Sequence, residues 1–369
     1  MDERVNFYDL TFPELSALVE AWGAAAYRAR QLWQGAYQHL WHTPAQFSNL
    51  PQNLRARLES EIHFDLLEPV TRLESSDGQT VKTLFRLHDG QLIEAVLMRY
   101  GDASPKREGG RRVRRTLCIS TQAGCGMGCT FCATGQMGFR RHLSSGEIVA
   151  QVLYYARKLA EAGEHVTNVV VMGMGEPFHN YDNTLAAIER LNDPQGFNLG
   201  ARRFTISTVG LVPAIRRFTT AGLQVGLAIS LHAADDESRA AMLPIAHKYP
   251  LADLMEAVRD YVTQTRRRVT FEWALIEGIN DTPETAARLA HLIRHYLPPH
   301  MTHVNAIPLN PTQGYHGKAA SQQRAEAFRQ KLASENISCT IRLRRGIDIQ
   351  AGCGQLASRE SSSPPKTLP

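Results

Sequence analysis

The sequence lacks any long apolar run, and this absence excludes the simplest membrane architectures. A membrane-spanning helix needs roughly 20 consecutive apolar residues, and no stretch of the chain approaches that length. The N-terminal segment MDERVNFYDL carries charges and has no apolar core of the kind found in secretory signals. We therefore expect a cytoplasmic protein that has no membrane partner.

Cysteine is scarce, and the few cysteines are placed in a way that does not suit a disulfide-stapled domain. The chain has 6 cysteines in 369 residues, and four of them fall between Cys118 and Cys132. In a reducing compartment, such a cluster indicates metal binding or catalysis rather than a structural framework. The paired C-x2-C knuckles of structural zinc sites are also missing, because only Cys129 and Cys132 have that spacing.

The sequence has no large excess of one charge, although its basic residues are unevenly placed. The net charge is +5, with 41 Lys and Arg against 36 Asp and Glu. Arginines gather at Arg111, Arg112, Arg114, Arg115, Arg140, Arg141, Arg266 to Arg268, Arg342, Arg344 and Arg345. Such clusters can neutralise nucleic-acid phosphates or form a solvated basic surface, and charge alone favours neither interpretation.

The first 112 residues divide into a helical part and a β-rich part. We expect residues 1–65 to form a small helical domain, in which Thr11 and Glu14 form a capping box before an amphipathic run. We expect residues 66–112 to form a β extension and linker, because the runs TVKTLFRL and QLIEAVLMRY are separated by turn signals. The polar end of this linker, GDASPKREGGRR, is expected to be mobile.

Residues 113–354 have a different rhythm, in which short β-branched strands alternate with amphipathic helices. The expected strands are VRRTLCIS, HVTNVVVMG, RRFTIST, LQVGLAIS, RVTFEWALI, HVNAIPL and ISCTIRL. Ser144 and Glu147 form a second capping box at the start of one of the helices between them. This alternation predicts parallel βαβ units, and therefore an α/β fold built on a full or partial (β/α) barrel. Residues 355–369, rich in Ser and Pro, are expected to be a disordered tail.

The run Cys125-Gly-Met-Gly-Cys129-Thr-Phe-Cys132 is the strongest chemical signal in the sequence. Its C-x3-C-x2-C spacing, directly after the first strand of the barrel-like region, suits a [4Fe-4S] cluster held by three thiolates. Three ligands leave one iron open to the amino and carboxyl groups of S-adenosylmethionine (SAM), which an electron from the cluster then cleaves to a 5′-deoxyadenosyl radical. The alternatives are a zinc knuckle with Cys118 as fourth ligand and a chance spacing of buried cysteines.

The segment TLCISTQAGCGMGCTFCATGQMGF resembles the RlmN family of dual-specificity RNA adenine-carbon-2 methyltransferases and their carbon-8 relatives, the Cfr group. The similarity continues through YRARQLW, MGMGEP, ISTVG, AISLHA, IPLNP and RRGIDIQAGCGQL. The resemblance implies a radical SAM partial (β/α) barrel with a helical N-terminal domain that binds RNA. It also implies 23S rRNA near the peptidyl transferase centre and the purine beside the anticodon of tRNAs as substrates. A low-potential electron donor such as flavodoxin or ferredoxin is the implied partner.

The resemblance assigns two further cysteines to methyl transfer. Ordinary polar transfer from SAM cannot methylate carbon 2 of adenine, because that carbon is electrophilic and has no lone pair. By resemblance, Cys353 accepts a methyl group from one SAM, and a second SAM supplies the radical that takes hydrogen from it. The carbon radical adds to the ring, and Cys118 removes the ring proton and forms a transient disulfide with Cys353. From the residues alone, both could be ordinary thiols, as we expect for Cys339.

Polar groups follow several predicted strands, at the end where barrel active sites form. By resemblance, the SAM contacts of the family fall on Gly175, Glu176, Ser207, Ser230, Leu231, His232 and Asn310. Glu94 matches a carboxylate that the family pattern treats as a proton acceptor, although Cys118 is a competing base. Gly352 stands where the family often has alanine, and we expect it to loosen the Cys353 loop.

Three classes of function are open at this point. The first is the RNA methyltransferase, with carbon 8 as the alternative to carbon 2. The second is another radical SAM enzyme, acting on a small molecule or a glycyl-radical partner, which would have no use for Cys118 and Cys353 together. The third is a zinc or iron–sulfur nucleic-acid-binding module without enzymatic activity, which would not need repeated βαβ units with polar strand ends.

Overall fold

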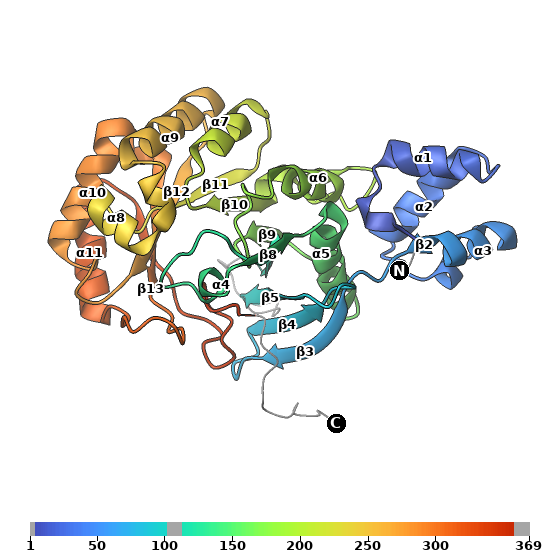
Figure 1. The fold of residues 1–369 in the computed structure, drawn as a ribbon, viewed down its shortest axis with the longest axis horizontal. Coiled ribbons are helices and arrows are strands. Elements are labelled where there is room, and N and C mark those ends of the chain that lie inside the picture. Colours follow the sequence, from blue (N-terminus) through green and yellow to red (C-terminus); the bar gives the residue numbers. More distant parts are fainter. Residues whose placement is uncertain (1–3, 102–112, 358–369) are drawn as a thin grey trace, which may run out of the picture.

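The computed structural model describes residues 4–101 and 113–357, which form a helical lobe beside a larger α/β body (Figure 1). The expectations of a mobile loop and a disordered tail fall on 102–112 and 358–369, which lie outside the described residues. Within the described ranges, no helix is both long enough and apolar enough to cross a membrane.

The helical lobe is built around an aromatic core. It contains α1 (Phe12–Ala21), α2 (Tyr27–Tyr37), α3 (Gln52–Glu61) and the paired short strands β1 (Val5–Asn6) and β2 (Ile62–His63). The predicted capping box of Thr11 and Glu14 is confirmed at the start of α1. Phe7 stacks on Phe64 with ring centroids 4.8 Å apart, and both are buried. Because aromatic side chains bury large apolar areas, these rings stabilise the lobe, and they belong to one buried cluster with the core of the body.

One open sheet forms the centre of the body. Within the described ranges its ten strands follow the order β14-β13-β12-β11-β10-β9-β6-β5-β4-β3. The parallel strands are β6 (Arg114–Cys118), β9 (Asn168–Val171), β10 (Phe204–Thr208), β11 (Gly226–Ser230), β12 (Val269–Leu275), β13 (Thr302–Pro308) and β14 (Cys339–Ile341). The sheet does not close on itself, so the predicted partial (β/α) barrel is confirmed.

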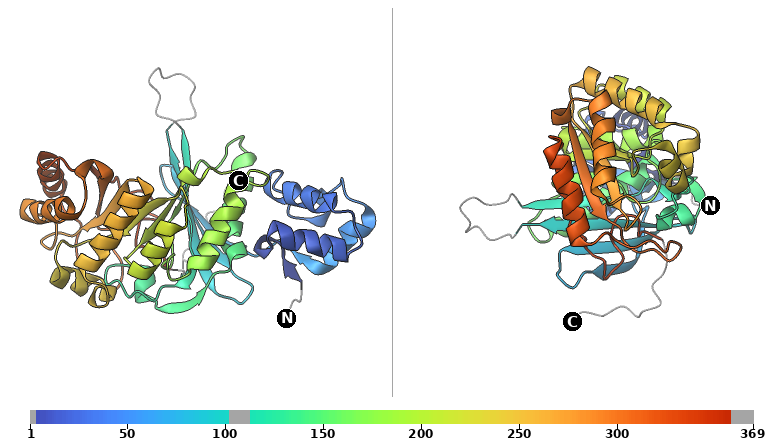
Figure 2. Two further views of the ribbon diagram at one scale, coloured as in Figure 1. Left: turned by 90° about the horizontal axis from the view of Figure 1, so that it is seen from above. Right: turned by 90° about the vertical axis from the view of Figure 1, so that its left-hand side faces the viewer.

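The β extension continues this sheet instead of forming a separate layer. Its strands β3 (Glu68–Glu74), β4 (Thr80–Arg86) and β5 (Leu92–Tyr100) pair antiparallel, and β5 pairs antiparallel with β6. In Figure 2 these strands run on directly from the curved sheet of the body. The β extension therefore places its own side chains beside the first strand of the barrel.

Helices cover the outer side of the parallel strands (Figure 1). They are α5 (Ser145–Ala160), α6 (Tyr181–Asn192), α7 (Val212–Thr220), α8 (Asp236–Met242), α9 (Leu251–Thr265), α10 (Pro283–Tyr296) and α11 (Gln322–Ser334). The capping box of Ser144 and Glu147 is confirmed at the start of α5. The sequence analysis did not predict the hairpin of β7 (Gln122–Gly124) and β8 (Phe139–His142) or the short α4 (Ala133–Gln136).

Asp9 attaches the lobe to the body. Its carboxylate accepts hydrogen bonds from the hydroxyl of Ser144 at 2.9 Å, the hydroxyl of Ser145 at 2.9 Å and the amide of Gly146 at 2.6 Å. A carboxylate at a helix N-terminus is favourable because it meets free amides and the positive end of the helix dipole. Arg190 of α6 adds a hydrogen bond to the Asp9 carbonyl at 2.7 Å.

Candidate active site

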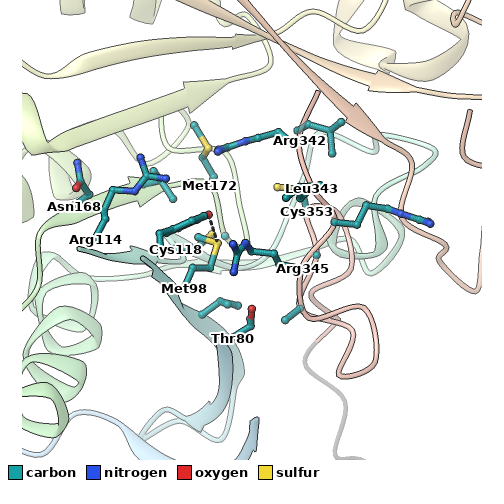
Figure 3. Close-up of a pocket in the computed structure, with 18 of the residues that line it drawn as sticks. Thr80, Met98, Arg114, Cys118, Asn168, Met172, Arg342, Leu343, Arg345 and Cys353 are labelled. Carbon is teal, nitrogen blue, oxygen red and sulfur yellow. Dashed lines mark hydrogen bonds between the residues drawn. The ribbon is translucent and has the colours of Figure 1, made fainter. Parts of the chain in front are cut away.

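Two adjoining cavities lie against the parallel strands: the narrow one at their carboxyl ends, and the wide one along β6 and β9 from the amino to the carboxyl end. The narrow cavity has a volume of about 160 Å³ and is lined by Cys125, Cys129, Cys132, Glu176, Ser207, Ser230, His232, Glu272, Asn310 and Cys353, among others. The wide cavity has a volume of about 980 Å³, and its walls include Cys118, Cys132, Asn310, Cys353 and five arginines (Figure 3). Because Cys132, Asn310 and Cys353 line both, the two cavities share a wall.

The three-cysteine loop lies between β7 and α4 and contributes all three thiols to the narrow cavity. Its entry is tight at Gly124, which has φ +72°, and a Cβ there would lie 2.0 Å from the carbonyl oxygen of Gly138. Burial raises the pKa of Cys125 to about 12. Free thiols in this setting carry their protons, so binding of a metal must release them.

The zinc-knuckle alternative finds no support in this geometry. Cys118 lines the wide cavity and is not among the residues that line the narrow one with the other three cysteines. In the described parts of the chain, no group of three or more His, Cys, Asp or Glu side chains is arranged to hold a single metal ion. Three thiols around a shared space of about 160 Å³ instead suit a group larger than one ion, such as a cluster.

Gly175 and Glu176 form the turn that follows β9. Gly175 has φ +99°, and a Cβ at this position would lie 2.6 Å from the Cβ of Gln122, so the turn requires glycine. The Glu176 carboxylate is buried and accepts from the amides of Phe178 at 3.0 Å and Val209 at 2.9 Å. Burial raises the pKa of Glu176 to about 7. Its hydrogen bonds thus join the ends of β9 and β10 at the cavity wall.

The ends of β10 and β11 contribute hydroxyl and imidazole groups. The hydroxyl oxygens of Ser207 and Ser230 lie 3.2 Å apart, and both residues line the narrow cavity. His232 has φ +61°, and its Nδ1 accepts from the amide of Ala274 at 2.9 Å. Burial lowers the pKa of His232 to about 3, so the ring is neutral at working pH. The predicted SAM contact Leu231 is buried. Within the described residues it lines neither cavity.

Asn310 connects the end of β13 to the loop that carries Cys353. Its Nδ2 donates to the carbonyl oxygen of Cys353 at 3.0 Å, while its buried Oδ1 has no partner within the described residues. An orphaned buried acceptor in a cavity wall is typical of a ligand site. The expectation that Gly352 loosens the loop stays a prediction. A Cβ at this position would lie 2.6 Å from Asn310 Nδ2, so glycine lets the loop pack closely here.

Cys118 and Cys353 come together in the wide cavity from distant parts of the chain (Figure 3). Cys118 is the buried last residue of β6, whereas the side chain of Cys353 is exposed to the cavity, and neither forms a disulfide. Although its side chain is exposed to the cavity, the surrounding protein desolvates the Cys353 thiol and raises its pKa to about 11, and Glu272 adds to the effect. Burial and the neighbouring Cys353 both raise the pKa of Cys118.

Five arginines line the wide cavity: Arg114, Arg203, Arg342, Arg344 and Arg345. The guanidinium carbons of Arg114 and Arg345 lie 4.2 Å and 4.5 Å from the ring centroid of Tyr100. No Asp or Glu lines this cavity within the described chain. The cavity wall is therefore strongly cationic and suited to an anionic ligand.

Glu94, like Leu231, lines neither cavity within the described residues. It is buried on β5, and its Oε1 pairs with the Nζ of Lys82 at 2.9 Å. Its Oε2 accepts from the amide of Ala357 at 2.9 Å. Both carboxylate oxygens thus have partners from the protein itself.

Glu272 is a site residue that the sequence analysis missed. It lies on β12, lines the narrow cavity and accepts from Asn305 at 2.7 Å. Burial raises the pKa of Glu272 to about 7. The signal in the sequence was an acidic residue inside the apolar strand TFEWAL, because a carboxylate that is buried without a partner is energetically costly.

Both parts of the chain match families of known proteins. Residues 119–290 match the Radical SAM superfamily, and residues 5–63 match the ribosomal RNA large subunit methyltransferase N-terminal domain. The probable dual-specificity RNA methyltransferase RlmN of Chloroflexus aurantiacus is 49% identical, over 98% of this chain and 94% of the relative. The dual-specificity RNA methyltransferase RlmN 1 of Myxococcus xanthus is 46% identical, over 100% of this chain and 98% of the relative. The crystal structure of a radical SAM methyltransferase from Sphaerobacter thermophilus superposes with a TM-score of 0.90 at 46% identity, covering 96% of this chain and 100% of that one.

Proposed function

The chain belongs to the RlmN family of SAM-dependent radical RNA methyltransferases, and on that premise we propose that it methylates carbon 2 of an adenosine in RNA. The proposed targets are 23S rRNA near the peptidyl transferase centre and the adenosine beside the anticodon of tRNAs. One observation supports this assignment above the others: Cys353 lines both cavities, and Cys118 lines the wide one with it. A residue that takes a methyl group from SAM and passes it to RNA has to be within reach of both molecules.

The narrow cavity suits the [4Fe-4S] cluster and SAM that the family uses. We assign the cluster to Cys125, Cys129 and Cys132, and the SAM contacts to Gly175, Glu176, Ser207, Ser230, His232 and Asn310, with Leu231 supporting them from the core. When bound, the cluster supplies the electron that cleaves SAM to a radical. Glu176 and Glu272 are carboxylates in a cavity that has no Lys or Arg among its described lining residues, which favours a cationic sulfonium ligand.

Cys353 and Cys118 divide the sulfur chemistry in the wide cavity. Cys353 Sγ loses its proton and takes the methyl carbon of one SAM, whose sulfonium bond breaks as the new C–S bond forms. After that carbon has lost a hydrogen atom and bonded to ring carbon 2, the adduct has to give up one electron, which the cluster, when bound, can take back, and Cys118 Sγ removes the ring proton. A bond between the two sulfurs then replaces the bond from Cys353 to the methylene carbon, which takes a proton and leaves as the methyl group of the product. An external thiol must reopen this disulfide before the next turnover.

The remaining assignments follow from the substrates. Ribosomes and tRNA are reached in the cytoplasm, where a flavodoxin or ferredoxin can deliver the electron. Methylation at carbon 8 is the alternative outcome, because both groups share the cysteine arrangement on which the assignment depends.

The test is a methyl-transfer assay with purified, cluster-loaded enzyme. RNA fragments of 23S rRNA and a tRNA are incubated with SAM carrying a labelled methyl group, and the digested nucleosides are identified by mass spectrometry. We expect labelled 2-methyladenosine from both RNAs. Labelled 8-methyladenosine would support the alternative, and no label in any RNA would contradict the proposal. The same nucleosides measured in rRNA of a strain that lacks the gene give the matching result in cells.

A further inference from the structure

One apolar side chain stands apart on the wall of the wide cavity. Leu343 is 81% exposed, the largest exposure of any large hydrophobic residue in the described chain. It lies two residues after the end of β14 and lines the wide cavity between Arg342 and Arg344. Single exposed leucines are ordinary on a protein surface. This one is unusual because it lies among cations at the cavity that contains Cys118 and Cys353 (Figure 3).

An RNA base has to leave its stack before it can enter such a cavity, and unstacking costs a few kcal/mol. Proteins that open nucleic-acid stacks insert apolar side chains such as Leu, Ile or Met between bases, beside Arg or Lys residues that bind the backbone. The segment Arg342–Arg345 has both parts of this combination, and Arg342, Arg344 and Arg345 form no ion pair with a carboxylate within the described ranges.

We propose that Leu343 inserts into the RNA base stack beside the target adenosine and holds that base out of the stack, while Arg342, Arg344 and Arg345 bind the flanking phosphates. The proposal rests on the proposed RNA methylation and adds how the base reaches the sulfurs. It commits to RNA as the partner, because arginines that form no ion pair attract phosphates and the apolar tip fits between bases.

The experiment uses an RNA hairpin with fluorescent 2-aminopurine in place of the target adenosine, since its emission rises when it unstacks. We expect wild-type enzyme to raise the fluorescence on binding. The Leu343→Ser variant should bind the hairpin but raise the fluorescence several-fold less, and Leu343→Met should behave like wild type. On unlabelled RNA, Leu343→Ser should methylate several-fold more slowly, and a bulged target that is already unstacked should restore its rate.

The outcomes separate the two hypotheses. Equal fluorescence and rates for Leu343→Ser and wild type would overturn the role of Leu343, as would a bulged RNA that does not restore the variant. Wild-type enzyme that unstacks the base but methylates no RNA would instead contradict the proposed function. SAM-dependent methylation of Cys353, measured from the mass of the intact protein, should be the same in wild type and both variants.

A different observation concerns the attachment of the Cys353 loop. The buried pair of Lys82 and Glu94 holds that loop on both sides, because Lys82 Nζ donates to the carbonyl of Gln350 at 3.2 Å and Glu94 Oε2 accepts from the amide of Ala357 at 2.9 Å. From this geometry we infer that Lys82 and Glu94 are positioning residues, which keep Cys353 between the two cavities.

This inference replaces the role of proton acceptor for Glu94. A general base needs hydrogen-bond reach to the proton that it removes. Glu94 lines neither cavity as described, and each of its carboxylate oxygens already accepts from a group of the protein. The inference rests on the proposed function only for its activity readout.

The test compares Glu94→Gln, which keeps an acceptor for the Ala357 amide, with Glu94→Ala, which does not. We expect Glu94→Gln to retain most activity, whereas Glu94→Ala should methylate Cys353 itself at least ten-fold more slowly. Hydrogen exchange should quicken in residues 346–357 of Glu94→Ala and stay unchanged in α9. If Glu94→Ala does not fold, Lys82→Met removes the hydrogen bond to Gln350 and the ion pair with Glu94, and it should show the same local change. Normal methylation of Cys353 in Glu94→Gln, together with loss of RNA methylation, would establish a base and overturn the inference.

Discussion

The two cavities share a wall but have opposite electrostatic character. The narrow cavity, of about 160 Å³, contains the carboxylates Glu176 and Glu272 and no Lys or Arg within the described chain. The wide cavity, of about 980 Å³, contains five arginines and no carboxylate within the same residues. The first therefore suits a small cationic ligand, and the second suits a large anionic one. Cys353 belongs to both, so it can accept a group on one side and pass it to the other.

The largest expected effect comes from removing the narrow cavity's thiols. Alanine at Cys125, Cys129 or Cys132 should abolish the brown iron–sulfur chromophore and all SAM cleavage, because two thiolates do not replace three. Iron content and cleavage of SAM are the measurements. Cys339→Ala is the matched control, since Cys339 on β14 lines neither cavity as described. Full iron content in any of the three variants would reject that cysteine as a ligand.

The second largest effect separates the two sulfurs while leaving Cys125, Cys129 and Cys132 in place. Cys353→Ala should give no methylated RNA and no covalent protein–RNA adduct. Cys118→Ala can still be methylated on Cys353 and can still add to the ring, so we expect its adduct to persist. Both proteins are purified from cells under denaturing conditions, digested with nuclease and weighed. A nucleotide on neither protein, or on both equally, would show that the two cysteines do not divide the work in this way.

A smaller effect is expected from the arginines of the wide cavity. Each phosphate contact contributes about one to the slope of log affinity against log salt concentration, so Arg342→Gln or Arg345→Gln should reduce that slope by about one. Binding of RNA is measured at several salt concentrations, and Arg259→Gln on α9, outside both cavity walls, is the control. A slope that stays at the wild-type value in both variants would remove these arginines from the RNA interface.

The smallest expected effect concerns an ion pair of β6, the strand that ends with Cys118. Arg115, buried on β6 ahead of Cys118, donates through Nε to Glu164 at 2.8 Å, and this hydrogen bond lowers the pKa of Glu164. Glu164→Gln should reduce the free energy of unfolding at neutral pH by about 1–3 kcal/mol, because the buried guanidinium loses its charged partner.

The lowered pKa of Glu164 predicts how this stabilisation changes with pH. Because the folded pKa of Glu164 is depressed, its stabilisation is present above the unfolded value of about 4.3 and is lost as pH falls through the folded pKa. Urea unfolding of wild type and Glu164→Gln should therefore differ at pH 7 and converge at low pH. A difference that is constant over this range would show that the ion pair does not contribute.

The strands and the strand-end residues could be predicted from sequence because both depend on local patterns. Each strand expected after residue 113 is present, and the polar residues at successive strand ends converge because parallel strands end at one edge of the sheet. The place of Glu94 could not be predicted in this way. Its environment depends on the pairing of β4 with β5 and on a contact with Ala357, 263 positions away. The close packing at Gly352 likewise depends on Asn310, which no local pattern indicates.

The attachment of the helical lobe through Asp9 has a consequence for which RNAs the enzyme can accept. Besides the contacts of Asp9 with the start of α5, the indole of Trp33 donates to Asp193 at 2.6 Å, so the lobe is fixed to both α5 and the end of α6. Because the lobe is fixed to the body, the span between it and the wide cavity is constant. That constant span would limit the shapes of RNA able to contact the lobe and the wide cavity at once.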